Sequence, residues 1–325
     1  MTRRLLRQFV TLAILGVGGV ALLACSSGGS DELTWDARSI QDSTDGAPFV
    51  PSILPTSVGV GDSRMLFALI DRETGTLVSD ATLEAHYYRL AEDPEAEPKT
   101  SEEVATLDVV KRVLDLRGVV SDGTPAADSD LTTVYSSTPS FDAAGYWGVV
   151  LDIEYQGKTY HPRMKFWVLQ ETPEIGIGQP APASTQLTLA DVDSASAISS
   201  MTNPNEDMLD ETVADALKTG NPIVVAFVTP TFCQTRFCGP VMDAVVQPAW
   251  EKYGDRVEFI HIEPYDLAKA RGEGVLEPVP TIAEWGIRQE PFIFVIDREG
   301  IVRSKLEGVT DVNELSDAIE KVLAE

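Results

Sequence analysis

The strongest constraint on the fold is a change of pattern at a segment marked by proline and glycine, residues 171–186. Before it, from residue 48, short apolar runs alternate with turn residues, which is typical of β-strands. After it, apolar runs of strand length alternate with segments of helical periodicity. A chain of 325 residues is long enough for two domains. We therefore expect an all-β domain at 48–170, a linker at 171–186 and an α/β domain at 187–325.

The composition is acidic, which limits the partners that the chain can take. Acidic residues outnumber basic ones 51 to 25, and the formal net charge is −26. A polyanion repels phosphate backbones, so we expect no binding to nucleic acid. An acidic, solvated surface is otherwise common in soluble proteins and identifies no substrate.

The first 25 residues have the pattern of an export signal. Three arginines, Arg3, Arg4 and Arg7, precede an uncharged run at 9–24, which is short for a membrane span but typical of a signal-peptide core. The run ends in Leu-Leu-Ala-Cys at Cys25 and resembles the lipobox of bacterial lipoproteins. That resemblance implies cleavage before Cys25 and attachment of lipid to it.

We therefore expect a lipoprotein signal peptide at 1–24 and an extracytoplasmic protein anchored to the cell membrane through Cys25. The serine- and glycine-rich residues that follow predict a flexible tether at 25–47. An ordinary signal peptide, or a short anchor helix with a chance cysteine, is the alternative.

The region 48–170 predicts strands and turns. The two apolar runs 146–155 and 158–160 flank Gln-Gly, which indicates a hairpin. The stretch Phe141 to Tyr146 resembles the tyrosine corner of immunoglobulin-like sandwiches, and this resemblance implies such a sandwich, acting as a spacer or binding a protein partner. Residues 104–114 have helical spacing but many β-branched residues, so their structure stays open.

His86 and His161 in this region could suggest a metal site. Their spacing fits no ligand set that we recognise, so we expect them to be core or hairpin residues.

After a first helix at 210–218, the region 187–325 predicts strands and helices in the order β-α-β-α-β-β-α. The expected strands are 223–228, 257–262, 292–296 and 301–306, and the main helices are 210–218, 238–253 and 311–323. Pro248 predicts a kink in the second helix, and Asp311 with Glu314 can cap the last one.

Three segments of this region are similar to the thioredoxin superfamily. They are Phe237-Cys238-Gly239-Pro240, the stretch 283–288 (Ala-Glu-Trp-Gly-Ile-Arg), and Glu290-Pro291 with the strand that follows. The resemblance implies a thioredoxin-like fold and a cis bond between Glu290 and Pro291. It also implies that these two residues face the cysteine loop and shape a substrate groove.

The chain departs from that family at the active site. Val241 stands where the second family cysteine is expected, and Cys233 lies upstream instead. The buried acid of classical members has no counterpart on the strand, where Ala226 stands. Ordinary thioredoxin activity is therefore not implied.

The remaining cysteines suggest redox chemistry. Outside the cytoplasm disulfides persist, and with Cys25 lipidated the available pair is Cys233 and Cys238. A disulfide closing so short a loop adds little stability, which favours a chemical role. Because Cys238 starts a helix, whose free amides stabilise an anion, we expect it to be the nucleophile and Cys233 the resolving residue. The expected partners are protein thiols and disulfides, with no cofactor.

Copper binding is one alternative. Two thiolates suit Cu(I), and His261 or Met242 could add a ligand to Cys233 and Cys238. Both of these additional residues also fit ordinary core packing.

Two further alternatives concern the same domain. Pro230, Thr235 and Cys238 loosely resemble a peroxiredoxin site, with one residue too many after the proline. The domain could also be a non-catalytic scaffold in a protein that acts by binding.

Overall fold

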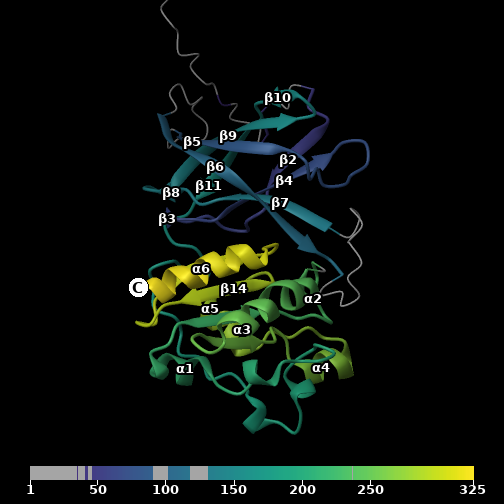
Figure 1. The fold of residues 1–325 in the computed structure, drawn as a ribbon, viewed down its shortest axis with the longest axis vertical. Helices are drawn as coiled ribbons and strands as arrows, with labels where there is room; N and C mark the ends of the chain where they lie inside the picture. Colours follow the sequence, from purple (N-terminus) through teal and green to yellow (C-terminus); the bar gives the residue numbers. More distant parts are fainter. Residues whose placement is uncertain (1–34, 36–40, 43–45, 91–101, 118–130, 236) are drawn as a thin grey trace, which may run out of the picture. The chain divides into compact units, whose positions relative to one another are not determined.

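The computed structural model describes residues 35, 41–42, 46–90, 102–117, 131–235 and 237–325 (Figure 1). The expected signal peptide and Cys25 lie outside these residues. Residues 33–325 form one compact unit, in which we distinguish a β lobe, containing strands β1 to β11, from an α/β lobe that follows it. No helix in the described part of the chain is both long and apolar enough to cross a membrane.

The β lobe is a curled antiparallel sheet with the strand order β1-β11-β9-β5-β6-β7-β4-β2. The short strand β10 pairs with β9, and β3 pairs with β8. The strands are β1 (Gln41–Asp42), β2 (Phe49–Ile53), β3 (Gly61–Asp62), β4 (Met65–Asp71), β5 (Thr82–Arg89), β6 (Glu102–Asp115), β7 (Leu131–Ser137), β8 (Ser140–Phe141), β9 (Gly145–Tyr155), β10 (Lys158–Tyr160) and β11 (Arg163–Val168).

Strand β6 settles the open question about residues 104–114 and changes the expected architecture. The segment is a 14-residue strand. Its first half pairs with β5 and its second half with β7, so one strand joins the two halves of the sheet. An immunoglobulin-like sandwich has two separate sheets. The lobe instead has one large sheet curled over a common core, with a separate two-stranded sheet of β3 and β8, and the Ig-like expectation is corrected to this extent.

The core of the β lobe lies inside the curl. Phe67 from β4, Tyr87 from β5 and Trp147 from β9 are fully buried in one hydrophobic cluster. The Gln156-Gly157 hairpin is confirmed, with β10 returning against β9. At the expected tyrosine corner, the Trp147 indole donates back to the carbonyl of Ala143 (3.0 Å).

Part of the predicted tether belongs to this lobe. Trp35 is buried against Tyr88 and Val150, and Gly148 leaves room for its ring. Strand β1 pairs with β11. The apolar ring and the strand pairing both tie this segment to the sheet, which the serine- and glycine-rich start of the tether did not suggest.

The α/β lobe has a four-stranded sheet with the order β13-β12-β14-β15. Strands β12 and β13 are parallel, and the other two pairs are antiparallel. The elements are η2 (Leu189–Asp191), η3 (Ala195–Ala197), η4 (Glu206–Met208), α1 (Val213–Thr219), β12 (Ile223–Phe227), α2 (Cys238–Val241), η5 (Met242–Val246), α3 (Gln247–Tyr253), β13 (Glu258–Ile262), α4 (Leu267–Glu273), α5 (Pro280–Trp285), β14 (Phe292–Ile296), β15 (Val302–Glu307) and α6 (Val312–Ala324).

Helices cover both faces of this sheet (Figure 1). Side chains of α2, α3 and α6 pack on one face, and those of α1 and α5 pack on the other. The helix expected at 238–253 is present as three successive segments, α2, the π-helical turn η5 and α3. Pro248 lies at the start of α3, where its missing amide is tolerated, and the kink stays a prediction.

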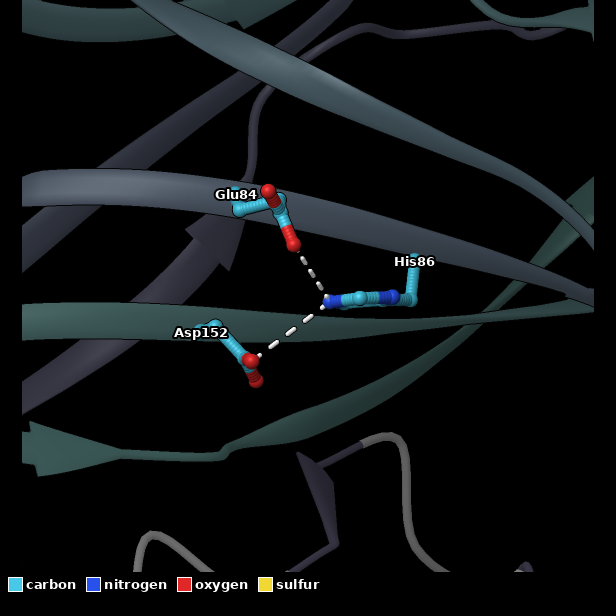
Figure 2. A group of neighbouring side chains, drawn as sticks. All are labelled: Glu84, His86 and Asp152. Carbon is cyan, nitrogen blue, oxygen red and sulfur yellow. Dashed lines mark ion pairs between the residues drawn. The ribbon is translucent and has the colours of Figure 1, made fainter.

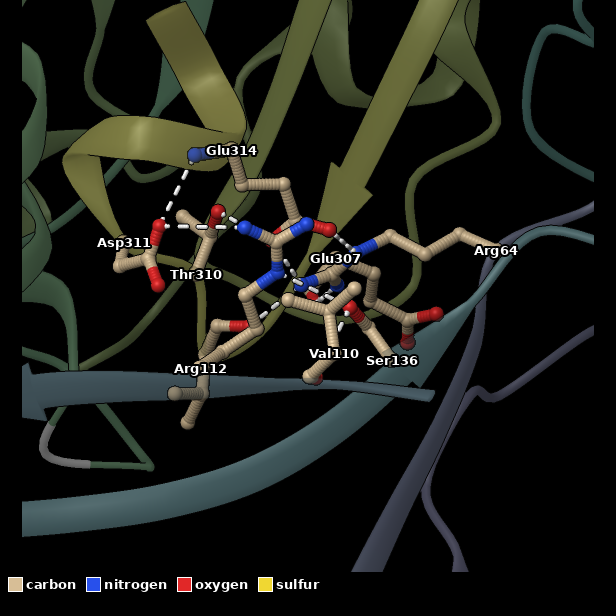
Figure 3. A network of polar contacts seen from close by, with 9 residues as sticks. Arg64, Val110, Arg112, Ser136, Glu307, Thr310, Asp311 and Glu314 are labelled. Carbon is tan, nitrogen blue, oxygen red and sulfur yellow. Dashed lines mark hydrogen bonds and ion pairs between the residues drawn. The ribbon is translucent and has the colours of Figure 1, made fainter. Parts of the chain in front are cut away.

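The two lobes share a hydrophobic core and a buried ionic network. Leu66, Leu114 and Val134 of the β lobe belong to the same buried cluster as α2 and α6. Beside it, Arg64 binds both carboxylate oxygens of Glu314 at 2.7 and 2.6 Å (Figure 3). The lobes are therefore joined by packed and desolvated contacts.

This network corrects one detail of the capping prediction. Asp311 caps α6, since its side chain accepts the amide of Glu314 (2.8 Å). The side chain of Glu314 does not complete the box. It turns toward Arg64 and Thr310, and Arg112 lies 3.8 Å away (Figure 3).

The predicted linker runs along the α/β lobe. Backbone amides of Ile175, Gly178 and Ala181 donate to carbonyls of Trp285, Val302 and Gly300, respectively. Glu174 is buried between Lys305 (2.6 Å) and Ser57 of the β lobe (2.7 Å). These bonds fix the segment against both lobes.

Candidate functional site

The two internal cysteines lie together where β12 leads into α2. Cys238 is the first residue of α2, and Cys233 is in the loop before it. The two form a disulfide with a Cα–Cα distance of 5.9 Å, which is within the range that disulfides require. The sequence thus identified the correct pair, and the loop folds back as expected.

The two sulfurs differ in burial. Cys238 is 0% exposed and belongs to the core cluster with Val241 and Met242. Cys233 is only partly buried and packs on the edge of that cluster. A reagent from solvent can therefore approach Cys233 more readily than Cys238.

Hydrogen-bond donors also favour Cys233. The backbone amide of Cys238, at the start of α2, donates to Cys233 Sγ (3.2 Å). The Thr235 hydroxyl lies 3.4 Å from the same sulfur. The amide donor stabilises a thiolate and adds the dipole of the helix terminus, whereas the single proton of the Thr235 hydroxyl is donated to the Glu290 carbonyl. The helix start thus supports an anion on Cys233, although the sequence placed that anion on Cys238.

The bond between Glu290 and Pro291 is cis, as the family resemblance implied, and it lies against the cysteine loop. Thr235 donates its hydroxyl proton to the Glu290 carbonyl (3.3 Å), and the Gln234 amide donates to Glu290 Oε1 (3.4 Å). Residue 290 therefore contacts the two residues that follow Cys233. The use of Glu290 and Pro291 as a substrate groove stays a prediction.

A tyrosine that the sequence did not single out completes this contact. Tyr265 donates to Glu290 Oε2 (3.2 Å) and accepts from the Gln234 side chain (3.0 Å). Burial and the nearby Glu290 charge raise the pKa of Tyr265, so it remains a neutral hydrogen-bond donor. The shape of the loop depends on this polar group as well as on the disulfide.

A buried acid lies on the neighbouring strand end, not on β12. Ala226 is buried on β12, as expected from its apolar side chain. Glu263 directly follows β13, is buried, and accepts the Ser200 amide (2.8 Å). Burial raises the pKa of Glu263, against the opposing effect of bonds from Thr229 and Ser200.

The copper ligand set is not assembled. His261 is buried on β13, and its Nε2 lies 2.8 Å from the Val228 carbonyl. Burial lowers the pKa of His261, so the ring is neutral and this nitrogen donates to the carbonyl. Among the described residues, the group of three that could hold a metal includes neither His261 nor the cysteines. Both His261 and Met242 are core residues.

The position of Thr235 does not support the peroxiredoxin alternative. Thr235 contacts Cys233 and the Glu290 carbonyl, and no contact with the Cys238 sulfur is present in the described chain. That comparison was based on the spacing of Pro230, Thr235 and Cys238 alone.

Comparison with known proteins identifies no family for this chain. No family model matches the chain. A curated protein, CRS2-associated factor 1 of Arabidopsis thaliana chloroplasts, is 29% identical over 147 residues, which are 44% of this chain. The match spans only 19% of that protein. We draw no functional inference from it.

Two solved structures are similar to the C-terminal third of the chain. One is a thioredoxin-like superfamily protein, with 22% identity and a TM-score of 0.25, covering 36% of this chain and 87% of that one. The other is a thiol:disulfide interchange protein of the thioredoxin family from Chlorobium tepidum, with 19% identity and a TM-score of 0.24. The match covers 35% of this chain and 86% of the Chlorobium tepidum chain.

Proposed function

We propose that the protein is a thiol-disulfide oxidoreductase that uses Cys233 and Cys238 as a dithiol-disulfide couple. The observation that carries this proposal is the pairing of a partly exposed sulfur, held by a helix-terminal amide, with a sealed sulfur at bonding distance. A pair of this kind can exchange with a disulfide and then resolve the mixed product.

The geometry supports a specific order of events. The Cys233 thiolate attacks one sulfur of a substrate disulfide, and the other substrate sulfur leaves as a thiolate that takes up a proton. Cys238 then loses its proton, and the resulting thiolate attacks Cys233 Sγ. The second substrate sulfur leaves as a thiolate and takes up a proton. The substrate gains two electrons and the protein becomes a disulfide. In the reverse direction the protein oxidises a dithiol.

These roles reverse the sequence-based assignment of Cys238 as nucleophile. Because Cys238 is fully buried, a substrate sulfur cannot reach it without a local opening of the α/β lobe. An attack from within the core on the neighbouring Cys233 needs no such opening.

We further propose that the protein works outside the cytoplasm, attached to the membrane by lipid on Cys25. This rests on the pattern of residues 1–25. The β lobe would hold the redox site at a distance from the anchor and could bind a protein partner. A non-catalytic scaffold remains the competing function, and it requires that the cysteine pair be inert.

Trapping of the mixed disulfide tests the proposal. The reduced Cys238→Ser and Cys233→Ser variants are each mixed with glutathione disulfide, and peptides are analysed by mass spectrometry. Cys238→Ser should accumulate glutathione on Cys233 rapidly, while Cys233→Ser should react far more slowly at Cys238. Fast reaction of Cys238 alone would restore the original assignment, and no reaction of either would favour the scaffold.

A further inference from the structure

The outer face of the β lobe brings together carboxylates and imidazoles from three neighbouring strands. On β5 and β9, Glu84 stands directly opposite Asp152. His86 is on the same face of β5, two residues further along (Figure 2). Like charges directly opposite each other across a strand pair are destabilising unless a cation lies between them. This face therefore needs a positive charge.

Within the described residues, histidines are the ion-pair partners of Glu84, Asp152 and Glu103. A protonated imidazole or a bound cation between Glu84 and Asp152 would neutralise these carboxylates.

The orientation of His86 distinguishes its two ring nitrogens. Nδ1 lies 3.0 Å from Glu103 Oε1 and 3.0 Å from the Thr106 hydroxyl, so it carries a proton for the carboxylate. Nε2 points between Glu84 Oε1 (3.1 Å) and Asp152 Oδ2 (3.5 Å) (Figure 2). Nε2 is shielded from solvent. Within the described structure it has no partner with hydrogen-bond geometry, although both oxygens lie at ion-pair distance.

We propose that Glu84, His86 and Asp152 bind a divalent transition-metal ion of the Zn²⁺ class. Imidazole nitrogen with two carboxylate oxygens is a common ligand set for Zn²⁺, and water completes the coordination. In a tetrahedral site with bonds of 2.0–2.2 Å, ligand atoms lie about 3.3–3.6 Å apart. The distances from Nε2 to the two oxygens are close to this spacing. The three ligand atoms all lie within 4.8 Å of one another.

The surrounding groups hold these ligands as metal sites require. Ligating histidines usually donate their second nitrogen to a carboxylate, which fixes the ring and makes the ligand more basic. Glu103 does this for His86. His161 lies 2.6 Å from the other oxygen of Asp152 and orients that carboxylate. His86 and His161, which the sequence analysis expected to be core or hairpin residues, thus both lie around one site on the outer face.

The metal would connect β5 to β9 across the face where their carboxylates repel. This role is independent of the cysteine chemistry, because its residues belong to the other lobe. The competing explanation is a protonated His86 that pairs with both carboxylates and binds no metal.

Calorimetric titration with Zn²⁺ separates the two explanations. The full chain is stripped with chelator, kept in its disulfide form, and alkylated at any remaining thiol. We expect one equivalent of Zn²⁺ to bind the wild type. His86→Gln should weaken binding by more than about 100-fold, and Glu103→Gln by about 10- to 100-fold.

The matched control is Glu154→Gln, which removes an exposed carboxylate two residues from Asp152 on the same strand and outside the ligand group. It should leave the affinity unchanged. Zn²⁺ should also raise the melting temperature of the wild type and of Glu154→Gln, because a ligand of the folded state stabilises it.

Glu84→Gln provides a second ligand variant at a half-exposed position in case His86→Gln does not fold. It should also weaken binding by more than tenfold. The proposal is overturned if the wild type binds no stoichiometric Zn²⁺, or if a folded ligand variant binds as tightly as Glu154→Gln.

Discussion

The interface between the lobes and the outer face of the β lobe both gather carboxylates, but they neutralise them differently. At the interface, Glu314 is desolvated and bound by Arg64, with Arg112 nearby (Figure 3). On the outer face, Glu84 and Asp152 share one imidazole (Figure 2). The chain has 25 lysine and arginine residues but 51 aspartate and glutamate residues. It uses two arginines where burial makes an unpaired charge most costly, and leaves half-exposed carboxylates open to a cation.

The difference bears on the redox site, because Cys238 lies in the hydrophobic cluster that both lobes build. Interface changes should therefore affect the whole molecule and the reactivity of Cys238. Changes on the outer face should affect metal binding and little else.

Removing Arg64 should have the largest effect on stability. Arg64→Ala leaves the buried Glu314 carboxylate without its main partner, and breaking a buried ion pair in this way costs about 3–5 kcal/mol. Urea unfolding at pH 7 measures the loss of unfolding free energy. Lys218→Ala is the control, since the pair of Lys218 with Asp215 is exposed and should contribute nothing measurable. Equal effects of the two variants would refute the contrast between interface and surface.

Shortening Leu114 should have the next largest effect. Leu114 is 1% exposed and packs from the β lobe into the cluster that contains Cys238. Leu114→Ala should destabilise the protein by about 2–5 kcal/mol through loss of burial and a residual cavity. It should also speed alkylation of Cys238 in the reduced protein.

The control for that experiment is Val110→Ala on the same strand, because Val110 is 48% exposed. It should change neither stability nor alkylation. If Leu114→Ala destabilises the protein but leaves Cys238 as protected as before, the β lobe does not seal that sulfur.

The charge on Glu314 should make the interface sensitive to acid. Burial acts to raise the pKa of Glu314, but the charges of Arg64 and Arg112 and the bonds from Arg64 and Thr310 outweigh it and lower the pKa below 4.5. The folded state thus binds fewer protons than the unfolded state, so this stabilisation is present above pH 4.5 and is lost as the pH falls through the folded-state pKa. Glu314→Gln should be less stable than wild type at pH 7, and the gap should narrow below pH 4.5. A gap that stays constant with pH would show that the charge is not responsible.

The smallest effect is expected at Glu211, a carboxylate with no ion pair among the described residues. Burial and then the charge of Glu258 raise the pKa of Glu211 to about 7. Its folded-state pKa lies above the unfolded value, so stability should fall as the pH rises from 4.5 through 7. Glu211→Gln should raise the melting temperature slightly at pH 8 and not at pH 4. Glu273→Gln, at an exposed position in α4, serves as the control, and an identical response of both variants would contradict the assignment.

Much of the α/β lobe could be predicted because its signals are local. The apolar strand β12, the glycine that ends α1 and the Asp311 cap of α6 each act within a few residues. The β lobe was harder, because β6 carries both helical spacing and β-branched residues, and only its pairing with β5 and β7 decides between them.

The details of the cysteine site also depended on tertiary structure. The spacing of Cys233 and Cys238 indicated a pair, but Cys238 is buried in a cluster whose members include residues as distant in sequence as Leu66 and Val309. The residues around His86 could not be grouped from spacing, because the register between β5 and β9 brings Glu84 and Asp152 together.

The reversible redox couple is tested most directly by equilibrating the protein in glutathione buffers, with dithiothreitol buffers for the most reducing potentials, and following peptides with Cys233 and Cys238 by alkylation and mass spectrometry. We predict a single two-electron transition in which both cysteines change together, at a potential between about −270 and −120 mV, the range of known thiol-disulfide oxidoreductases. A disulfide that resists reduction below about −300 mV, or cysteines that stay reduced throughout, would contradict the proposed function.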